Sequence, residues 1–152
     1  MDISKLNTGR EDCPFNIDAV EKKYNAKYVG ELCLKSRGDW VNAPASIFYQ
    51  ETPPVEGYSK YFALVIQNGT ALITSGESAI SEPIWVIEAN DGELIYSRYR
   101  HDYRESKDKS VFIDGGRDYV RASSNKLISL EIKDGKFEFS NFDLNKDKRP
   151  SI

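Results

Sequence analysis

The sequence has few of the residues that build metal and redox sites. It contains two cysteines, Cys13 and Cys33, and one histidine, His101. The cysteine spacing matches neither a CxxC redox motif nor a zinc-ligand pattern, so we expect no metal and no cofactor. A chain of this length buries enough surface to fold without a disulfide, and free thiols are the usual state of cytoplasmic cysteines.

The chain also lacks a long apolar run and an excess of positive charge. Residues 1–15 include acidic side chains and no apolar core segment, which argues against a signal peptide and a membrane anchor. The 21 basic and 24 acidic residues give a formal charge of −3, which disfavours general DNA binding. We therefore expect a soluble cytoplasmic protein in which any anion site is local.

The overall composition predicts a folded chain. Hydrophobic residues make up 39% and charged residues 30%, a balance unlike that of intrinsically disordered proteins. No linker divides the chain, so residues 1–142 are expected to form a single β-rich domain. Residues 143–152 are charged and lack periodicity, and they are expected to form a solvated tail.

One short helix is predicted near the N-terminus, at about residues 17–25. Ile17, Val20 and Tyr24 fall on one face at helical spacing. Asn16 is a favourable N-cap residue, and the apolar residue before it is placed to pack on the first turns of the helix.

Antiparallel strands are predicted from about residue 28 onward, where apolar residues alternate with polar ones between turn signals. Three hairpins are indicated by turn pairs, namely Asn68-Gly69 in residues 61–74, Asp91-Gly92 in residues 84–100 and Asp134-Gly135 in residues 127–139. Two-residue loops would place Ile66 opposite Ala71, Leu64 opposite Ile73, Ile87 opposite Tyr96, Trp85 opposite Arg98, Ile132 opposite Phe137 and Leu130 opposite Phe139. Both faces of the first hairpin are apolar, which predicts central strands covered on both sides.

Further short strands are expected at residues 28–35, 45–50 and 111–113, the last leading into a turn at Gly115-Gly116. The predicted fold class is therefore all-β, a mainly antiparallel sandwich or distorted barrel built from hairpins, with one short N-terminal helix. The segment at residues 51–59 contains Pro53-Pro54 and is expected to be a surface loop. Tyr58 in this loop is a candidate partner-binding residue, whereas Trp40 and Phe48 are expected in the core.

Arginine and tyrosine concentrate in residues 96–104 and 114–121. Guanidinium groups bind phosphates and carboxylates in a bidentate manner, and tyrosine rings offer surfaces on which bases stack. An extended strand would place Arg98, Arg100 and Arg104 on one face. The candidate ligand-binding residues are Arg98, Tyr99, Arg100, Tyr103, Arg104, Arg117, Tyr119 and Arg121.

A structural interpretation of the same residues remains open. Arginine and aspartate alternate closely in both segments, so they could neutralise one another across neighbouring strands. Catalysis has weaker support, because His101 and Asp102 are sequence neighbours that would point to opposite faces of a strand. Carboxylates such as Glu88, Asp114 and Asp118 could still converge as an acid and base pair in a hydrolase.

These observations predict a non-catalytic binding module that captures an anionic, phosphate-bearing small ligand of the nucleotide or cyclic-nucleotide class. The alternative is an inhibitor or immunity-type protein that binds a protein partner through an interface including Tyr58. A homodimer is compatible with both hypotheses.

Overall fold

The computed structural model describes residues 1–52, 59–124 and 126–140. Its helices are η1 (Ile3–Lys5), η2 (Arg10–Asp12), α1 (Ile17–Tyr24) and α2 (Glu77–Ile80). Its strands are β1 (Lys27–Leu32), β2 (Lys35–Ser36), β3 (Asp39–Trp40), β4 (Ala45–Tyr49), β5 (Tyr61–Gln67), β6 (Thr70–Ser75), β7 (Ile84–Glu88), β8 (Leu94–Ile95), β9 (Arg104–Glu105), β10 (Phe112–Asp114), β11 (Arg121–Ala122), β12 (Leu127–Lys133) and β13 (Lys136–Phe139).

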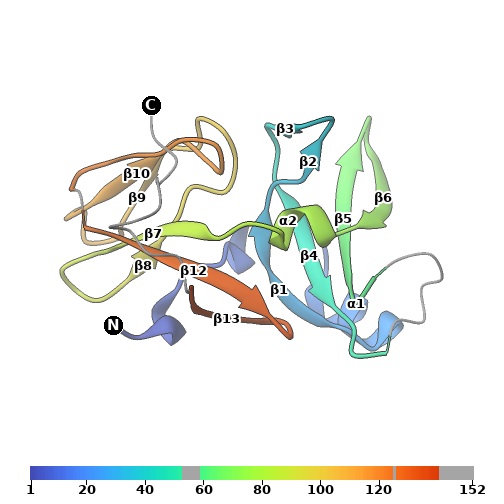
Figure 1. Cartoon of the computed structure of the whole chain (residues 1–152). Coiled ribbons are helices and arrows are strands. Elements are labelled where there is room, and N and C mark those ends of the chain that lie inside the picture. The colour runs from blue at the N-terminus through green and yellow to red at the C-terminus, as the bar shows by residue number, and fades with distance from the viewer. Residues whose placement is uncertain (53–58, 125, 141–152) are drawn as a thin grey trace.

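Two four-stranded antiparallel sheets make up most of the molecule, with strand orders β1-β4-β5-β6 and β13-β12-β7-β8 (Figure 1). The main core joins them, since it contains Ile47 and Ala63 from the first sheet and Val86 and Leu130 from the second, all fully buried. The prediction of a mainly antiparallel all-β fold with one short N-terminal helix is confirmed.

The helix α1 packs against the first sheet, and the two form a second hydrophobic core between them. Asn16 caps it as predicted, because its side chain accepts a hydrogen bond from the Ala19 amide at 3.1 Å. Ile17 is buried in this core together with Phe48 and Phe62, whose rings stack with their centroids 5.3 Å apart. The expected places of Trp40 and Phe48 in the interior are also confirmed.

A third, three-stranded sheet of order β11-β10-β9 packs on the second four-stranded sheet. Ile113 on β10 and Val120 are buried there against Trp85, Ile87 and neighbouring apolar residues. The predicted return of the chain after Gly115-Gly116 is found, since β10 and β11 are antiparallel.

Two of the three predicted hairpins have the expected register. Strand β5 pairs with β6 so that Ile66 lies opposite Ala71 and Leu64 opposite Ile73. Strand β12 pairs with β13 so that Ile132 lies opposite Phe137 and Leu130 opposite Phe139. Asn68 and Asp134 have positive φ angles of 52° and 51°, as a primed two-residue turn requires.

The register of the hairpin between β7 and β8 was predicted wrongly by one residue. Ile87 lies opposite Ile95 rather than Tyr96. The Ala89 amide donates to the Glu93 carbonyl and the Gly92 amide to the Ala89 carbonyl, so the loop holds three residues and Gly92 takes the left-handed position. A three-residue loop of this kind is the next most common alternative to the two-residue turn.

The prediction that residues 96–104 form one extended strand is also wrong. Strand β8 ends at Ile95, and His101 adopts a positive φ of 65° in a turn. The alternation of side chains therefore breaks, and Arg98 and Arg100 do not share one face: Arg98 is buried and Arg100 is exposed.

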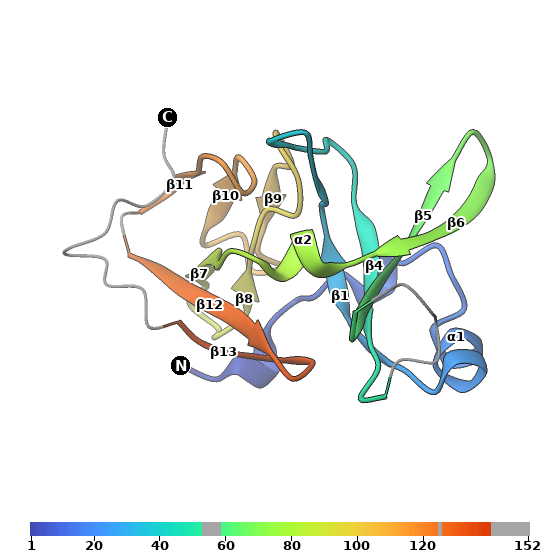
Figure 2. The ribbon, with the colours of Figure 1, turned by 45° about the vertical axis from the view of Figure 1, so that its right-hand side comes forward.

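The β5–β6 hairpin is not covered on both faces over its whole length, contrary to expectation. The first four residues of β5 are buried, whereas Ile66 and Leu72 are 55% and 41% exposed. Figure 2 shows the distal half of this hairpin extending away from the other strands. Strand β6 lies at the end of the sheet order, and its residues 70–72 are exposed.

Three expectations fall outside the described residues, namely those for Pro53-Pro54, for Tyr58 and for residues 143–152. In the part that is described, no helix is both long and apolar enough to cross a membrane.

Candidate functional site

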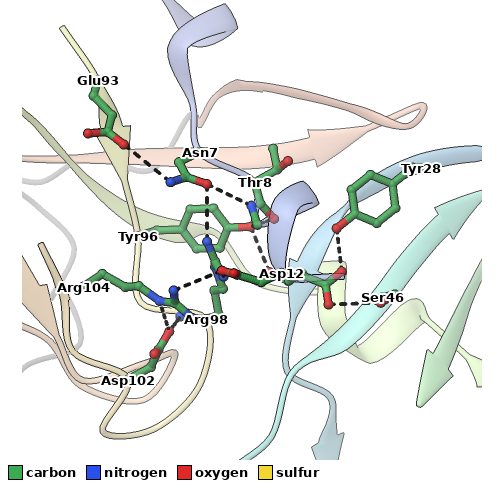
Figure 3. Close-up of polar contacts among 12 residues, drawn as sticks. Asn7, Thr8, Asp12, Tyr28, Ser46, Glu93, Tyr96, Arg98, Asp102 and Arg104 are labelled. Atoms are coloured by element: carbon green, nitrogen blue, oxygen red, sulfur yellow. Dashed lines mark hydrogen bonds and ion pairs between the residues drawn. The ribbon is translucent and has the colours of Figure 1, made fainter. Parts of the chain in front are cut away.

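The structure separates the arginines that the sequence grouped together. Arg98 and Arg104 belong to a polar network beneath the N-terminal segment (Figure 3). Arg117 is buried elsewhere, and Arg100 lies on the surface beside Tyr119. The eight candidate ligand-binding residues thus do not form a single pocket.

Arg98 is held by groups from the N-terminal segment. Its Nη1 lies 2.7 Å from Oδ2 of Asp12, and its Nη2 donates to Oδ1 of Asn7 at 3.3 Å. Only 3% of the Arg98 side chain is exposed, against 59% for Asp12. The charge-assisted hydrogen bond from Arg98 lowers the pKa of the Asp12 carboxyl.

Arg104 extends the network to a second carboxylate. Its Nε donates to Oδ2 of Asp102 at 2.9 Å, and its Nη1 lies 3.3 Å from Oδ2 of Asp12. The same Asp102 oxygen accepts the backbone amide of Arg98 at 3.0 Å. Two arginines therefore face two aspartates, and the formal charges of the four groups cancel.

A buried glutamate lies beside this network on β1. Glu31 accepts the Tyr28 hydroxyl at 2.5 Å and the Ser46 hydroxyl at 3.0 Å (Figure 3). Burial raises the pKa of the Glu31 carboxyl, and these two hydrogen bonds offset only part of that effect. The Tyr96 hydroxyl donates to the Glu31 backbone carbonyl at 2.8 Å, which ties β1 to the segment after β8.

Gly9 allows the N-terminal segment to cross the network closely. Its φ is +85°, and a Cβ at this position would lie 2.7 Å from Cζ of Arg98 and 2.8 Å from Cγ of Glu31. A larger residue would therefore push the segment away from both side chains.

Two hollows adjoin the network, and Asn7 lines both. The larger is an open groove of about 540 Å³, and the smaller, beside Arg98 and Arg104, holds about 70 Å³. The charged side chains that line the groove are Lys5, Arg10, Lys107, Glu11, Asp91 and Glu93. Three cations and three anions give the groove no preference for an anionic ligand.

The buried side chain of Arg117 is held by two backbone carbonyls and an aromatic ring. Its Nη1 donates to the Ala79 carbonyl at 2.6 Å and its Nη2 to the Glu82 carbonyl, while its guanidinium lies 4.4 Å from the centre of the Trp40 ring. Only 3% of the residue is exposed, and this burial lowers the pKa of the guanidinium. Arg117 joins the end of α2 to β3, and no surface ligand could reach it without a rearrangement.

The exposed cluster around Arg100 comes closest to the predicted ligand site. Arg100 pairs with Asp118 and lies over the Tyr119 ring, and the Tyr119 hydroxyl contacts the imidazole of His101. The cluster is built from two loops, which meet where the His101 amide donates to the Gly115 carbonyl at 2.6 Å.

The remaining candidates lie apart from this cluster. Tyr99 is half-buried, with its carbonyl accepting the Ser97 hydroxyl. Tyr103 is 55% exposed and stacks on Phe112 with ring centroids 5.5 Å apart. Arg121 is exposed on β11. The structure therefore keeps Arg100 beside Tyr119 and Arg98 beside Arg104, and it places Tyr99, Tyr103, Arg117 and Arg121 in other surroundings.

His101 and Asp102 have different partners in the structure. Asp102 is buried against Arg98 and Arg104, whereas His101 is exposed against Tyr119, so the two do not form a catalytic pair. Within the described ranges, no group of three His, Cys, Asp or Glu residues is arranged to hold a metal ion.

The sequence reasoning missed two features. The role of Asn7 and Asp12 depends on contacts with residues about 90 positions later, which leave no local pattern. The second feature is readable in the sequence: residues 61–76 contain no charged side chain, in a chain where 30% of residues are charged. Ile66 and Leu72, the exposed apolar residues of the hairpin, lie within this stretch.

Comparison with known proteins gives no further information on the site. The chain matches no protein-family model, no curated protein and no solved structure. Its function therefore has to be inferred from its own residues.

Proposed function

We propose that this protein is a non-catalytic interaction protein, of the inhibitor or immunity type, that binds a protein partner through the distal half of the β5–β6 hairpin. The observation that carries this proposal is the exposure of Ile66 (55%) and Leu72 (41%) within an uncharged stretch of 16 residues, 61–76. Exposed strands are usually protected by charged residues, and apolar ones without that protection associate with other chains.

The hairpin presents two different apolar surfaces. Because side chains alternate along a strand, Ile66 and its cross-strand neighbour Ala71 share one face. Val65 and Leu72 are also directly opposite each other and share the other face. A partner could therefore bind either face or enclose the hairpin.

The base of the hairpin is rigidly anchored. Tyr61, Phe62, Ala63 and Leu64 are buried in the two cores on either side of β5. The distal half therefore extends from a buried base, which lowers the cost of ordering the hairpin on binding.

Capture of partners from a lysate of the source cells by immobilised wild-type protein and by a hairpin variant tests the proposal. Ile66→Glu with Leu72→Glu places two charges on the exposed positions and leaves the buried half unchanged, so we expect a discrete set of captured proteins to be lost. Arg100→Ala is the matched surface control and should capture the same proteins as the wild type. Identical capture by the wild type and the hairpin variant would refute the proposal.

A second candidate function is capture of an anionic small ligand, supported by the exposed cluster of Arg100, His101 and Tyr119. Asp118 already neutralises Arg100, so a phosphate would have to displace this carboxylate. Thermal unfolding against a panel of nucleotides, cyclic nucleotides and sugar phosphates tests it, since a ligand at 100 times its Kd stabilises the fold by about 2.7 kcal/mol. A shift that Arg100→Ala abolishes would support this candidate, and a panel without any shift would exclude the tested ligand classes.

We place this activity in the cytoplasm. Cys13 and Cys33 are both free thiols, as a reducing compartment would keep them.

A further inference from the structure

We propose that the outer face of the paired strands β9 and β10 binds an arginine side chain of a basic protein partner. This face carries two aromatic rings and two carboxylates, those of Tyr103, Phe112, Glu105 and Asp114. It belongs to a different sheet from the β5–β6 hairpin, and the two surfaces lie apart in both views (Figure 1 and Figure 2). Binding at one surface therefore does not require binding at the other.

The register of the strands brings the four side chains together. Glu105 lies directly opposite Phe112, so these two side chains share one face. Asp114 points to the same side as Phe112 because side chains alternate along a strand, whereas Ile113 between them is buried on the inner side. Continued by one residue, this register places Tyr103 opposite Asp114.

The Tyr103 ring offers a free surface for a cation. It stacks on Phe112 with ring centroids 5.5 Å apart and an interplanar angle of 23°, yet 55% of Tyr103 remains exposed. Because Phe112 covers one side of the ring, the exposed part includes the opposite side. A guanidinium placed over a tyrosine ring is attracted by the negative potential of the π system and stacks on it.

The two carboxylates favour a cation over an anion at this ring. The Tyr103 hydroxyl donates to Oε2 of Glu105 at 3.3 Å. Partial burial and the negative charges of Glu105 and Asp114 raise the pKa of the Tyr103 hydroxyl, so both charges act at the ring. Oδ1 of Asp114 is buried and has no hydrogen-bond partner among the described residues. A bound guanidinium would bring a positive charge to this carboxylate.

Arg121 does not already supply that charge. It lies directly opposite Asp114 on β11, but these two described side chains form no ion pair. Strand β10 is the central strand of the sheet, so Asp114 lies between Arg121 and Tyr103. Two strand spacings separate the backbones of Arg121 and Tyr103 by about 10 Å, which leaves the ring to a cation from outside.

A basic partner also suits the charge of the whole chain. The formal charge of −3 attracts positively charged proteins and increases their rate of encounter. Arginine fits the face better than lysine, because a planar guanidinium can stack on the ring while it donates two parallel hydrogen bonds to a carboxylate. We therefore expect the partner to present an arginine in an exposed basic segment.

Titration of the full chain with acetyl-arginine amide, followed by NMR, tests the inference. Acetyl-citrulline amide is the matched probe, since its side chain has nearly the same shape and no charge. The aromatic resonances of Tyr103 and Phe112 should shift and saturate with the arginine probe, with a Kd on the order of 10 mM. The citrulline probe should bind at least about fivefold more weakly.

Two variants locate the binding site on this face. Tyr103→Ala removes the ring and Asp114→Asn removes one charge, so each should weaken binding of the arginine probe at least about threefold. Asp18→Asn is the matched control, because it makes the same change at a position on α1 whose side chain is 90% exposed. It should bind the probe like the wild type. Circular dichroism and thermal unfolding establish that each variant is folded before its binding is compared.

Three results would overturn the inference. Resonances of Tyr103 and Phe112 that do not shift with up to about 50 mM arginine probe would mean that the face does not bind a guanidinium. Equal binding of the arginine and citrulline probes would mean that the charge is not recognised. An equal loss of binding in Asp18→Asn and Asp114→Asn would mean that the net charge of the chain, and not this face, attracts the probe.

Discussion

Nη1 of Arg98 lies 2.7 Å from Oδ2 of Asp12, which joins two residues 86 positions apart in the chain. The guanidinium is almost fully buried, whereas its partner carboxylate is 59% exposed at the edge of the N-terminal segment. Asp12 also reaches Arg104, so one exposed carboxylate pairs with two arginines. This contact ties the N-terminal segment to the strands that follow β8.

Asp12→Ala should destabilise the fold by about 1–3 kcal/mol, because it leaves the buried Arg98 without its nearest counter-ion. The exposed position of Asp12 allows water to replace part of the lost interaction, which keeps the loss below that of a fully buried pair. Urea unfolding at pH 7 measures the effect. Asp18→Ala is the control, since Asp18 lies 3.7 Å from Arg10 with 90% of its side chain exposed, and it should cost less than about 1 kcal/mol.

The contribution of Asp12 to the free energy of unfolding should also depend on pH. Its pKa is lowered in the folded protein, so its stabilising effect is present above the ordinary pKa of 3.8 and is lost as the pH falls below that value. The difference between the wild type and Asp12→Ala should therefore shrink in acid. A difference that stays the same down to pH 3 would contradict this assignment.

The Glu31→Gln variant should become more stable relative to the wild type as the pH rises. The pKa of Glu31 is raised in the folded protein above its ordinary value of 4.5, so the folded state binds more protons than the unfolded state just above that pH. The free energy of unfolding of the wild type therefore falls as the pH rises through the window between the two pKa values. The variant lacks this titration.

A series of urea midpoints between pH 4 and pH 8 measures the difference between the Glu31→Gln variant and the wild type. Glu88→Gln, at an exposed position of β7, is the control for the effects of the substitution itself. A difference between Glu31→Gln and the wild type that does not change across the series would mean that burial does not disturb the Glu31 carboxyl.

The sequence predicted those parts of the fold that local chemistry determines. The Asn68-Gly69 and Asp134-Gly135 pairs fix both the turn and the register of their hairpins, and Asn16 fixes the start of α1. The Asp91-Gly92 turn was predicted one residue out of register, because the same pair also suits a three-residue loop. The break after Ile95 had no local signal, since the turn there depends on contacts made by Arg98, Asp102 and the Gly115 carbonyl.

The candidate site was less predictable than the fold for a related reason. Clustering in sequence placed Arg98, Arg100 and Arg117 together, but the fold gives them separate partners in Asp12, Asp118 and the carbonyls at the end of α2. Alternating arginine and aspartate fits a ligand site and an internally paired network equally well. The uncharged hairpin was visible in the sequence, but only the exposure of Ile66 and Leu72 distinguishes it from an ordinary buried strand pair.

Arg117→Ala should destabilise the fold by about 2–4 kcal/mol, because it leaves the carbonyls of Ala79 and Glu82 without their donor and opens a space under Trp40. Arg100→Ala should cost less than about 1 kcal/mol, because its ion pair with Asp118 is partly exposed. Chemical unfolding of both variants under one set of conditions compares them directly. Equal losses of stability would mean that Arg117 contributes no more to the folded state than Arg100 does.

Gly116→Ala should destabilise the fold more than Gly38→Ala does. Both glycines have a positive φ, +135° and +87°, so each substitution strains the backbone. At Gly116 the added Cβ would also lie 2.8 Å from the backbone nitrogen of Arg100, whereas at Gly38 it would meet nothing within 4 Å. Gly38→Ala should therefore cost about 1 kcal/mol, and Gly116→Ala at least about twice as much.

The same pair of variants tests how the surface cluster is held together. The clash at position 116 pushes the two loops apart, so Gly116→Ala should also separate Arg100 from Asp118 and His101 from Tyr119. The NMR chemical shifts of the His101 imidazole should change in Gly116→Ala and remain those of the wild type in Gly38→Ala. If the resonances are unchanged while stability falls, the glycine supports the fold but not the arrangement of the cluster, and the close approach of the two loops does not position Arg100.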